Sequence, residues 1–229
     1  MTDWLARFAG AHNDLLAFAL SVAMLAGYQF FLRYKLRRNP TYTIQAVNAI
    51  ARAAWVESIM RERKDILAVQ TLRNSTMAAT FLASTAILLI IGVLTLTAQG
   101  DKLGDIWHAL NFLGTTHSAL WLSKLLLLLL DLFTAFFCFS MSIRIYNHVG
   151  YMINVPLSLA HKAISPEHVA THLNRGGAYY SLGMRAFYYI VPLVFWLFDP
   201  LLMLISTVAL LALLVRVDRT PQLMERDYA

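Results

Sequence analysis

The sequence is short of charged residues and of cysteine, and each shortage argues against a class of protein. Only 14% of the 229 residues are charged and 59% are hydrophobic, whereas soluble domains have about 25% and about 45–50%. We therefore predict an integral membrane protein embedded in the lipid bilayer. The single cysteine, Cys138, rules out an internal disulfide. Its place in an apolar run predicts a buried, inert thiol.

Recognisable catalytic motifs are missing as well. The chain has no GxSxG, P-loop, GxGxxG or CxxC pattern. His168 and His172 are spaced to share a metal, but the glutamate that completes an HExxH motif is absent. We predict a protein that is not an enzyme and that has no catalytic residue, no metal site and no cofactor.

Basic residues are in excess, with a net charge of +6, and nine of them lie between Arg33 and Arg73. Clusters of this kind bind nucleic acid in many soluble proteins. Beside apolar stretches they instead set the orientation of a membrane protein. The second explanation fits this sequence, so we expect no nucleic-acid partner.

Four apolar stretches suggest membrane spans, at residues 15–32, 77–97, 119–143 and 187–215. The first is uncharged and measures about 27 Å as a helix at ~1.5 Å per residue, against a hydrocarbon core of ~30 Å. Asp199-Pro200 interrupts the last stretch and leaves halves that are short for separate crossings, which favours one kinked helix. The predicted fold is all-α: a single membrane domain over residues 1–229, an integral membrane bundle of four transmembrane helices.

Two linkers, residues 33–76 and 144–186, separate these spans and carry most of the positive charge. Thirteen Lys and Arg residues lie in the linkers up to Arg185 and five outside them, with Lys124 left out because it is near the end of a span. The positive-inside rule then places both linkers in the cytoplasm and both termini outside. The expected location is the inner (plasma) membrane of a bacterium. A hairpin at Asp199-Pro200 would return the C-terminus to the cytoplasm.

The linkers carry amphipathic helical patterns. Thr41–Lys64 predicts a helix that lies on the membrane surface or packs on other protein. Ser165-Pro166 has the pattern of a helix start, with proline in the first turn, and Gly176-Gly177 has the pattern of its end.

One polar stripe runs along the helix predicted from Asp65 to Gly100. Spacings of three and four place its members on one helix face, which we expect the other helices to bury; they are Gln70, Arg73, Asn74, Met77, Thr80, Phe81, Ser84 and Leu88. Gln70, Arg73 and Asn74 form a candidate binding site at the cytoplasmic mouth of the span, where Arg73 can clamp a carboxylate or phosphate. The alternative is structural: Arg73 pairs with a linker acid, while Gln70 and Asn74 hydrogen-bond the backbone.

Two acidic residues lie inside apolar stretches. Asp131 precedes Arg144 by 13 residues and Asp199 follows Arg185 by 14, which places both carboxyls about 20 Å deep. With Ser84 they form a candidate mid-membrane polar layer. A charge at this depth costs at least ~2.5–3.5 kcal/mol and often marks an ion or proton path. The alternative is a clasp between helices, with Asp199 capping the helix that follows it.

The string AVQTLRNSTMAAT (Ala68–Thr80) resembles the hallmark of a membrane protein family called domain of unknown function 599, which has bacterial and plant members. Further matching segments are Trp55-Val56, Ser142-Ile143-Arg144 with Asn147, Gly183-Met184-Arg185-Ala186-Phe187-Tyr188, Pro192-Leu193 and Trp196. The resemblance covers roughly Tyr34–Val215. It implies a polytopic protein with about four spans and no known activity; Asp131 and Asp199 lie outside the family pattern.

Two functional hypotheses follow. The first is a small, oligomeric transport or channel-type protein in which Ser84, Asp131 and Asp199 line a polar path. Several subunits are expected because four helices hardly enclose a wide pore. The second is a non-catalytic membrane scaffold or assembly factor that binds another membrane complex through Gln70, Arg73 and the cytoplasmic helices.

Overall fold

The computed structural model describes residues 2–98, 118–159 and 164–220. Within these ranges the chain is all-helical, as predicted, apart from one isolated bridge between the extended residues Thr43 and Arg219. The helices are α1 (Thr2–Arg38), α2 (Ile44–Glu62), α3 (Asp65–Ala98), α5 (Ser118–Met152), the short 3-10 helix η1 (Leu157–Leu159), α6 (Pro166–Phe198) and α7 (Pro200–Asp218).

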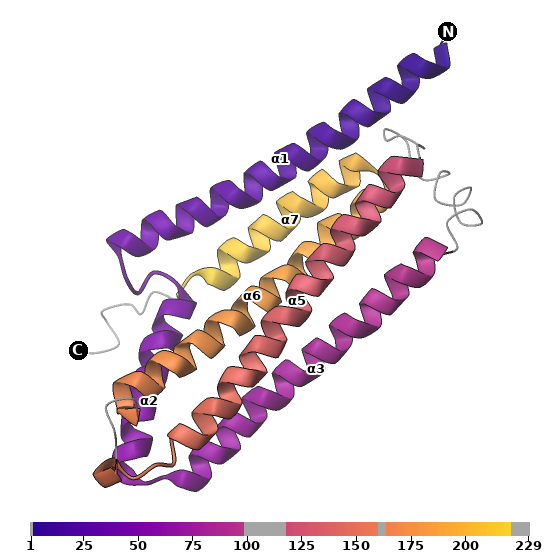
Figure 1. Cartoon of the computed structure of the whole chain (residues 1–229). Helices are drawn as coiled ribbons and strands as arrows, with labels where there is room; N and C mark the ends of the chain where they lie inside the picture. Colours follow the sequence, from indigo (N-terminus) through magenta and orange to yellow (C-terminus); the bar gives the residue numbers. More distant parts are fainter. Residues whose placement is uncertain (1, 99–117, 160–163, 221–229) are drawn as a thin grey trace.

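Five of the described helices are long and apolar enough to cross a membrane: α1 from His12 onward, α3, α5 from Leu120 onward, α6 and α7. They run alongside one another, with α7 between α1 and α6 and with α3 at the opposite edge (Figure 1). The shorter α2 lies at one end of the bundle. We call this end the head: α2 together with the ends of α3, α5 and α6 that pack on it.

The prediction of one kinked helix over residues 187–215 is wrong. Helix α6 ends at Phe198, the backbone of Asp199 is extended (φ −159°, ψ 140°), and α7 begins at Pro200. Helix α7 then returns along α6 toward the head (Figure 1). The described part of the chain therefore has five candidate spans and not four.

The apolar residues after Arg185 are only part of α6, so their number underestimates the length of this helix. Helix α6 includes that arginine and many residues before it, and the charge is neutralised inside the bundle by Asp218 at the end of α7, at 3.1 Å. A paired charge can lie within a crossing that an unpaired charge would end.

The predicted linker over residues 144–186 is mostly helix. Helix α5 continues to Met152, and α6 begins at Pro166 with the Ser165 hydroxyl accepting from the His168 backbone N–H, which confirms the predicted helix start. The predicted end at Gly176-Gly177 is wrong, because α6 runs through both glycines. A Cβ atom at Gly176 would lie 2.8 Å from the Tyr146 ring, so glycine here permits close helix contact.

The head has its own hydrophobic core. Side chains from α2, α3, α5 and α6 meet there, including Val56, Ile59, Leu72, Val149 and Val169, which are all buried. Because α3 has 34 residues, it measures about 51 Å and exceeds a hydrocarbon core of ~30 Å. Helix α3 is therefore longer than a single crossing requires.

A polar clasp fastens α2 to α6 in the head. Arg52 Nε donates to Asn174 Oδ1 at 2.8 Å, and Asn174 Nδ2 donates to the Ala49 carbonyl at 3.1 Å. Burial lowers the pKa of the Arg52 guanidinium from its ordinary value. The clasp fixes the predicted amphipathic helix against protein, which was one of the two alternatives for it.

Candidate functional site

Helix α1 meets the bundle through a row of polar side chains. Asp14, Ser21 and Tyr28 follow one another at steps of seven residues, which keeps them close to one face of the helix. Each makes a hydrogen bond or ion pair with another helix. We call these three residues and their partners the polar ladder. Its outer rung contains Asp14, its middle rung Ser21 and its inner rung Tyr28.

The outer rung is a buried ion pair. Lys124 Nζ of α5 lies 2.6 Å from Asp14 Oδ1, and the two side chains are 3% and 0% exposed. Lys124 Nζ also donates to the Trp196 carbonyl at 3.0 Å, and Trp196 Nε1 donates to Asp14 Oδ1 at 2.9 Å. The Phe18 ring stacks on the Trp196 ring with centroids 4.8 Å apart. Three helices thus close around one salt bridge.

Burying two charges costs several kcal/mol per ion, and only good geometry with further hydrogen bonds offsets that cost. The indole N–H and the backbone carbonyl of Trp196 supply those further bonds. Loss of either charged partner would leave the other buried without its opposite charge. The outer rung is consequently a place where a small change in structure has a large energetic effect.

The middle rung joins two hydroxyls inside the apolar layer. Thr207 Oγ1 of α7 lies 3.2 Å from Ser21 Oγ and 2.8 Å from the Met203 carbonyl. Both hydroxyl side chains are buried. The rung is uncharged and weak compared with its neighbours.

The inner rung is a five-residue network between α1, α6 and α7. Arg185 Nη2 donates to both carboxylate oxygens of Asp218, at 3.1 and 3.2 Å, and Arg185 Nη1 donates to Gln29 Oε1. The Tyr28 hydroxyl donates to Asp218 Oδ2 at 2.9 Å. Gln29 Nε2 donates to the Tyr189 hydroxyl at 3.0 Å. The planar guanidinium is suited to this because it can bind several acceptors at once.

The two charged rungs lie at opposite ends of the same seam. Asp14 and Tyr28 are separated by 14 residues of α1, or about 21 Å. A hollow of about 270 Å³ lies beside the outer rung, between α1 and α7; its lining is Asn13, Leu16, Ala17, Leu20, Pro200, Leu201 and Leu204. A buried ion pair therefore lies at each end of the seam, Asp14–Lys124 between α1 and α5 and Arg185–Asp218 between α6 and α7, and the hollow lies next to the first.

The polar stripe on α3 is not buried, contrary to the prediction. Gln70, Arg73, Asn74 and Ser84 are all exposed on the outer side of the bundle. The face that packs on α5 consists of small and aliphatic side chains, among them Ala68, Leu72, Ala79, Ala83 and Ala86. Alanines let two helices approach closely, and in a membrane this packing replaces the hydrophobic effect as the source of association.

Asp131, Asp199 and Ser84 do not form one layer. Asp199 is the N-cap of α7 at the far end, where its Oδ1 accepts from the Leu201 N–H at 2.7 Å. Asp131 lies seven residues beyond Lys124 on α5, about 10 Å deeper along that helix. Ser84 faces outward. One Asp131 oxygen, Oδ2, is buried and has no hydrogen-bond partner within the described residues.

The residues that carry the family resemblance have different surroundings. Arg144 and Asn147 are exposed on α5. A Cβ atom at Gly183 would lie 2.7 Å from the Phe139 ring, so this glycine permits contact between α5 and α6. Arg185 belongs to the inner rung and Trp196 to the outer rung. In the described part of the chain no three His, Cys, Asp or Glu side chains are grouped to hold a metal ion.

Sequence reasoning missed the outer rung. Asp14 directly precedes one apolar run and Lys124 directly precedes another, so two isolated opposite charges beside spans were the available signal. Their pairing depends on which helices are neighbours, and the spacing of residues along one helix does not contain that information.

Five described helices that are long and apolar enough to cross a membrane, four of them joined by buried polar rungs, indicate a multi-pass membrane protein. The profile of the family described as "Protein of unknown function, DUF599" matches residues 16–223, so the chain belongs to that family, as its motifs predicted. Comparisons with curated proteins and with solved structures give no match.

Proposed function

We propose that this protein is a small membrane transport protein whose path follows the seam between α1 and α7. The observation that carries the proposal is the pair of buried ion bridges at the two ends of that seam, with a hydroxyl pair between them. Ionisable groups within a membrane domain commonly belong to ion or proton pathways. This path differs from the one predicted through Ser84, Asp131 and Asp199.

The charged rungs suit the role of gates. Each holds a carboxylate, Asp14 or Asp218, against a cation, so breaking one rung would hydrate that carboxylate while the other end stays closed. Helix α1 packs mainly on α7, and its polar contacts are few enough to break together. Movement of α1 would break the Asp14–Lys124 pair at one end and the Tyr28–Asp218 hydrogen bond at the other without unfolding the bundle.

A proton is the cargo or coupling ion that this chemistry favours. The ladder offers carboxylates and hydroxyls, which bind and pass protons. A proton needs no wide pore, so one chain suffices for the path. Oligomerisation, which the sequence led us to expect, is then a separate question.

The test is a cross-link across the middle rung. Ser21→Cys with Thr207→Cys, made in a Cys138→Ser background, places two thiols where hydroxyl oxygens lie 3.2 Å apart, close enough for a disulfide after small adjustment. Proton flux is measured in vesicles loaded with a pH-sensitive dye, with the membrane potential clamped. We expect flux from the reduced protein, its loss on oxidation and its return with reductant.

Each single cysteine variant is the matched control and should keep its flux under the same oxidant. Absence of proton flux from the reduced and the unmodified protein would contradict a proton path. Flux that is indifferent to the cross-link would contradict a path along this seam.

We propose that the head lies in the cytoplasm. Among the described side chains, one cation, Lys124, lies in the far half and fourteen lie toward the head: Arg33, Lys35, Arg37, Arg38, Arg52, Arg61, Arg63, Lys64, Arg73, Arg144, Arg175, Arg185, Arg216 and Arg219. The positive-inside rule then places α2 and the end of α7 inside, and the start of α1 outside, in a bacterial plasma membrane. Both termini outside, the arrangement predicted with four spans, would need an even number of crossings.

Labelling of single cysteines with a membrane-impermeant maleimide tests this orientation. Ala54→Cys in α2 and Arg219→Cys after α7 should react from the cytoplasmic side, and His12→Cys should react from outside. Reaction of Arg219→Cys and His12→Cys from the same side would restore the four-span arrangement and refute five crossings.

The scaffold alternative has its own supporting observation. The family-type stretch on α3 presents Gln70, Arg73 and Asn74 to the outside of the bundle, where another membrane protein or a second copy can reach them. Under this alternative Arg73→Ala removes a co-purifying partner while the thermal stability of the purified protein stays unchanged. Retention of every partner by Arg73→Ala would count against it.

A further inference from the structure

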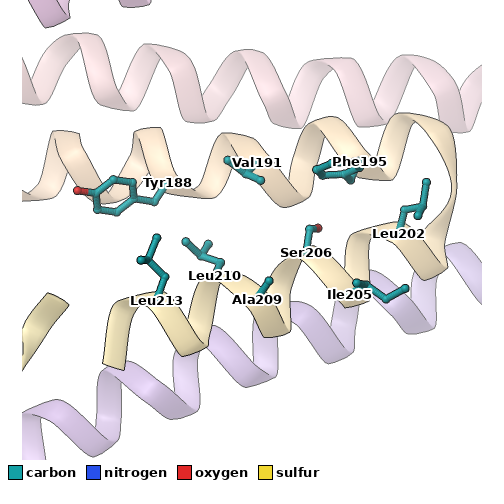
Figure 2. A pocket seen from close by; sticks show the side chains of 9 residues that line it. All are labelled: Tyr188, Val191, Phe195, Leu202, Ile205, Ser206, Ala209, Leu210 and Leu213. Carbon is teal, nitrogen blue, oxygen red and sulfur yellow. The ribbon is translucent and has the colours of Figure 1, made fainter. Parts of the chain in front are cut away.

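A groove lies between α6 and α7 on a flank that the polar ladder does not use. Its volume is about 430 Å³. Tyr188, Val191 and Phe195 form the α6 wall, and Leu202, Ala209 and Leu213 are part of the α7 wall (Figure 2). Apart from the Tyr188 and Ser206 hydroxyls, every lining side chain is hydrocarbon.

The groove has the length of a lipid tail. From Leu202 to Leu213 the α7 wall measures about 16 Å, close to half of a hydrocarbon core of ~30 Å. Leu202, Phe195 and the turn close one end, and Tyr188 and Leu213 stand at the other, with the Tyr188 hydroxyl directed away from the turn (Figure 2). The open end therefore points toward the head.

A free cation continues the α7 wall at this open end. Arg216 follows Ala209 and Leu213 at steps of four and three, so it lies on the same face one turn further on. Arg216 is exposed, and within the described residues it makes no hydrogen bond or ion pair. The neighbouring acid, Asp218, is buried and bound to Arg185.

We propose that the groove binds one acyl chain of an anionic phospholipid, with the phosphate held by Arg216 and the Tyr188 hydroxyl. The observations that carry this are the apolar groove of one-leaflet length and the unpaired guanidinium at its open end. Guanidinium binds phosphate oxygens through two parallel hydrogen bonds, and a cation near a membrane surface favours anionic lipids. The site is independent of the transport proposal, because it shares no side chain with the polar ladder.

The test is native mass spectrometry of the full-length protein with phosphatidylglycerol and phosphatidylcholine of identical acyl chains. We expect wild type to retain phosphatidylglycerol about fivefold over phosphatidylcholine. Arg216→Gln should abolish this preference, and Arg144→Gln, at an exposed cation of α5, should keep it. Ala209→Trp should fill the groove and reduce retention of both lipids.

Two results would overturn the proposal. One is an Arg216→Gln variant that keeps the preference of wild type. The other is a lipid-free dimer that Ala209→Trp breaks, because it would assign the groove to a second copy of the chain. Ala209 is exposed, and the thermal stability of each variant, measured in the same detergent, confirms that it is folded.

Discussion

Lys124→Met is expected to destabilise the protein by about 3–5 kcal/mol, because it removes the cation that balances the buried Asp14 carboxylate. Lys124 Nζ contacts Asp14 Oδ1 at 2.6 Å and the Trp196 carbonyl at 3.0 Å. Methionine fills a similar volume, so the loss is one of charge pairing and not of packing. Reversible unfolding in mild detergent measures it.

The double variant Asp14→Leu with Lys124→Met should recover most of that loss, since a buried ion pair replaced by apolar residues of similar volume is often neutral. A double-mutant cycle isolates the coupling between the two residues. Lys64→Met is the control: its partner Glu62 is exposed, so the cost should stay below about 1 kcal/mol. A double variant as unstable as Lys124→Met alone would show that the two charges do not depend on each other.

Arg185→Met is expected to cost about 3 kcal/mol, the lower end for breaking a buried pair, because Arg185 retains a little exposure at 18%. Arg185→Lys should recover less than half of this. An ammonium on a flexible stem cannot reproduce the fork that binds Asp218 and Gln29 together. Thermal unfolding of the purified variants is the measurement.

Arg144→Met provides the matched control for this second prediction. Arg144 also belongs to a segment with family resemblance but is exposed on α5, so its replacement should change stability by no more than ~0.5 kcal/mol. Equal losses from Arg144→Met and Arg185→Met would mean that the inner rung contributes nothing beyond an ordinary surface arginine.

The sequence predicted the helices better than their connections. The helix starts at Asp65 and at Ser165-Pro166 are predicted by the sequence and found in the structure. A helix start depends on a few neighbouring residues, so local sequence can predict it. At Asp199-Pro200 the sequence indicates an interruption and favours a kink, whereas the structure has a turn between two helices. Whether the chain kinks or turns back at this point depends on how well α7 packs along α6. The residues that meet in that packing are distant in sequence.

The candidate site was predicted less well, for a related reason. Helical spacing correctly placed Gln70, Arg73 and Ser84 on one face of α3, yet it could not tell whether that face turns inward. The alanines on the opposite face determine which side of α3 packs inward, because they allow α3 and α5 to approach each other closely. Asp14 and Lys124 carried too little local pattern to be paired, although each stood out as a charge beside an apolar run.

Sided labelling of Ser21→Cys, in a Cys138→Ser background, tests the central claim most directly. Ser21 is 1% exposed and lies midway between the charged rungs, so a membrane-impermeant thiol reagent should not reach it in the otherwise unchanged protein. With Asp14→Asn added, we predict labelling from the far side only. With Arg185→Gln added instead, we predict labelling from the head side only. A cysteine at this position that stays unreactive in both backgrounds, or reacts equally from both sides, would contradict a seam closed by two separate gates.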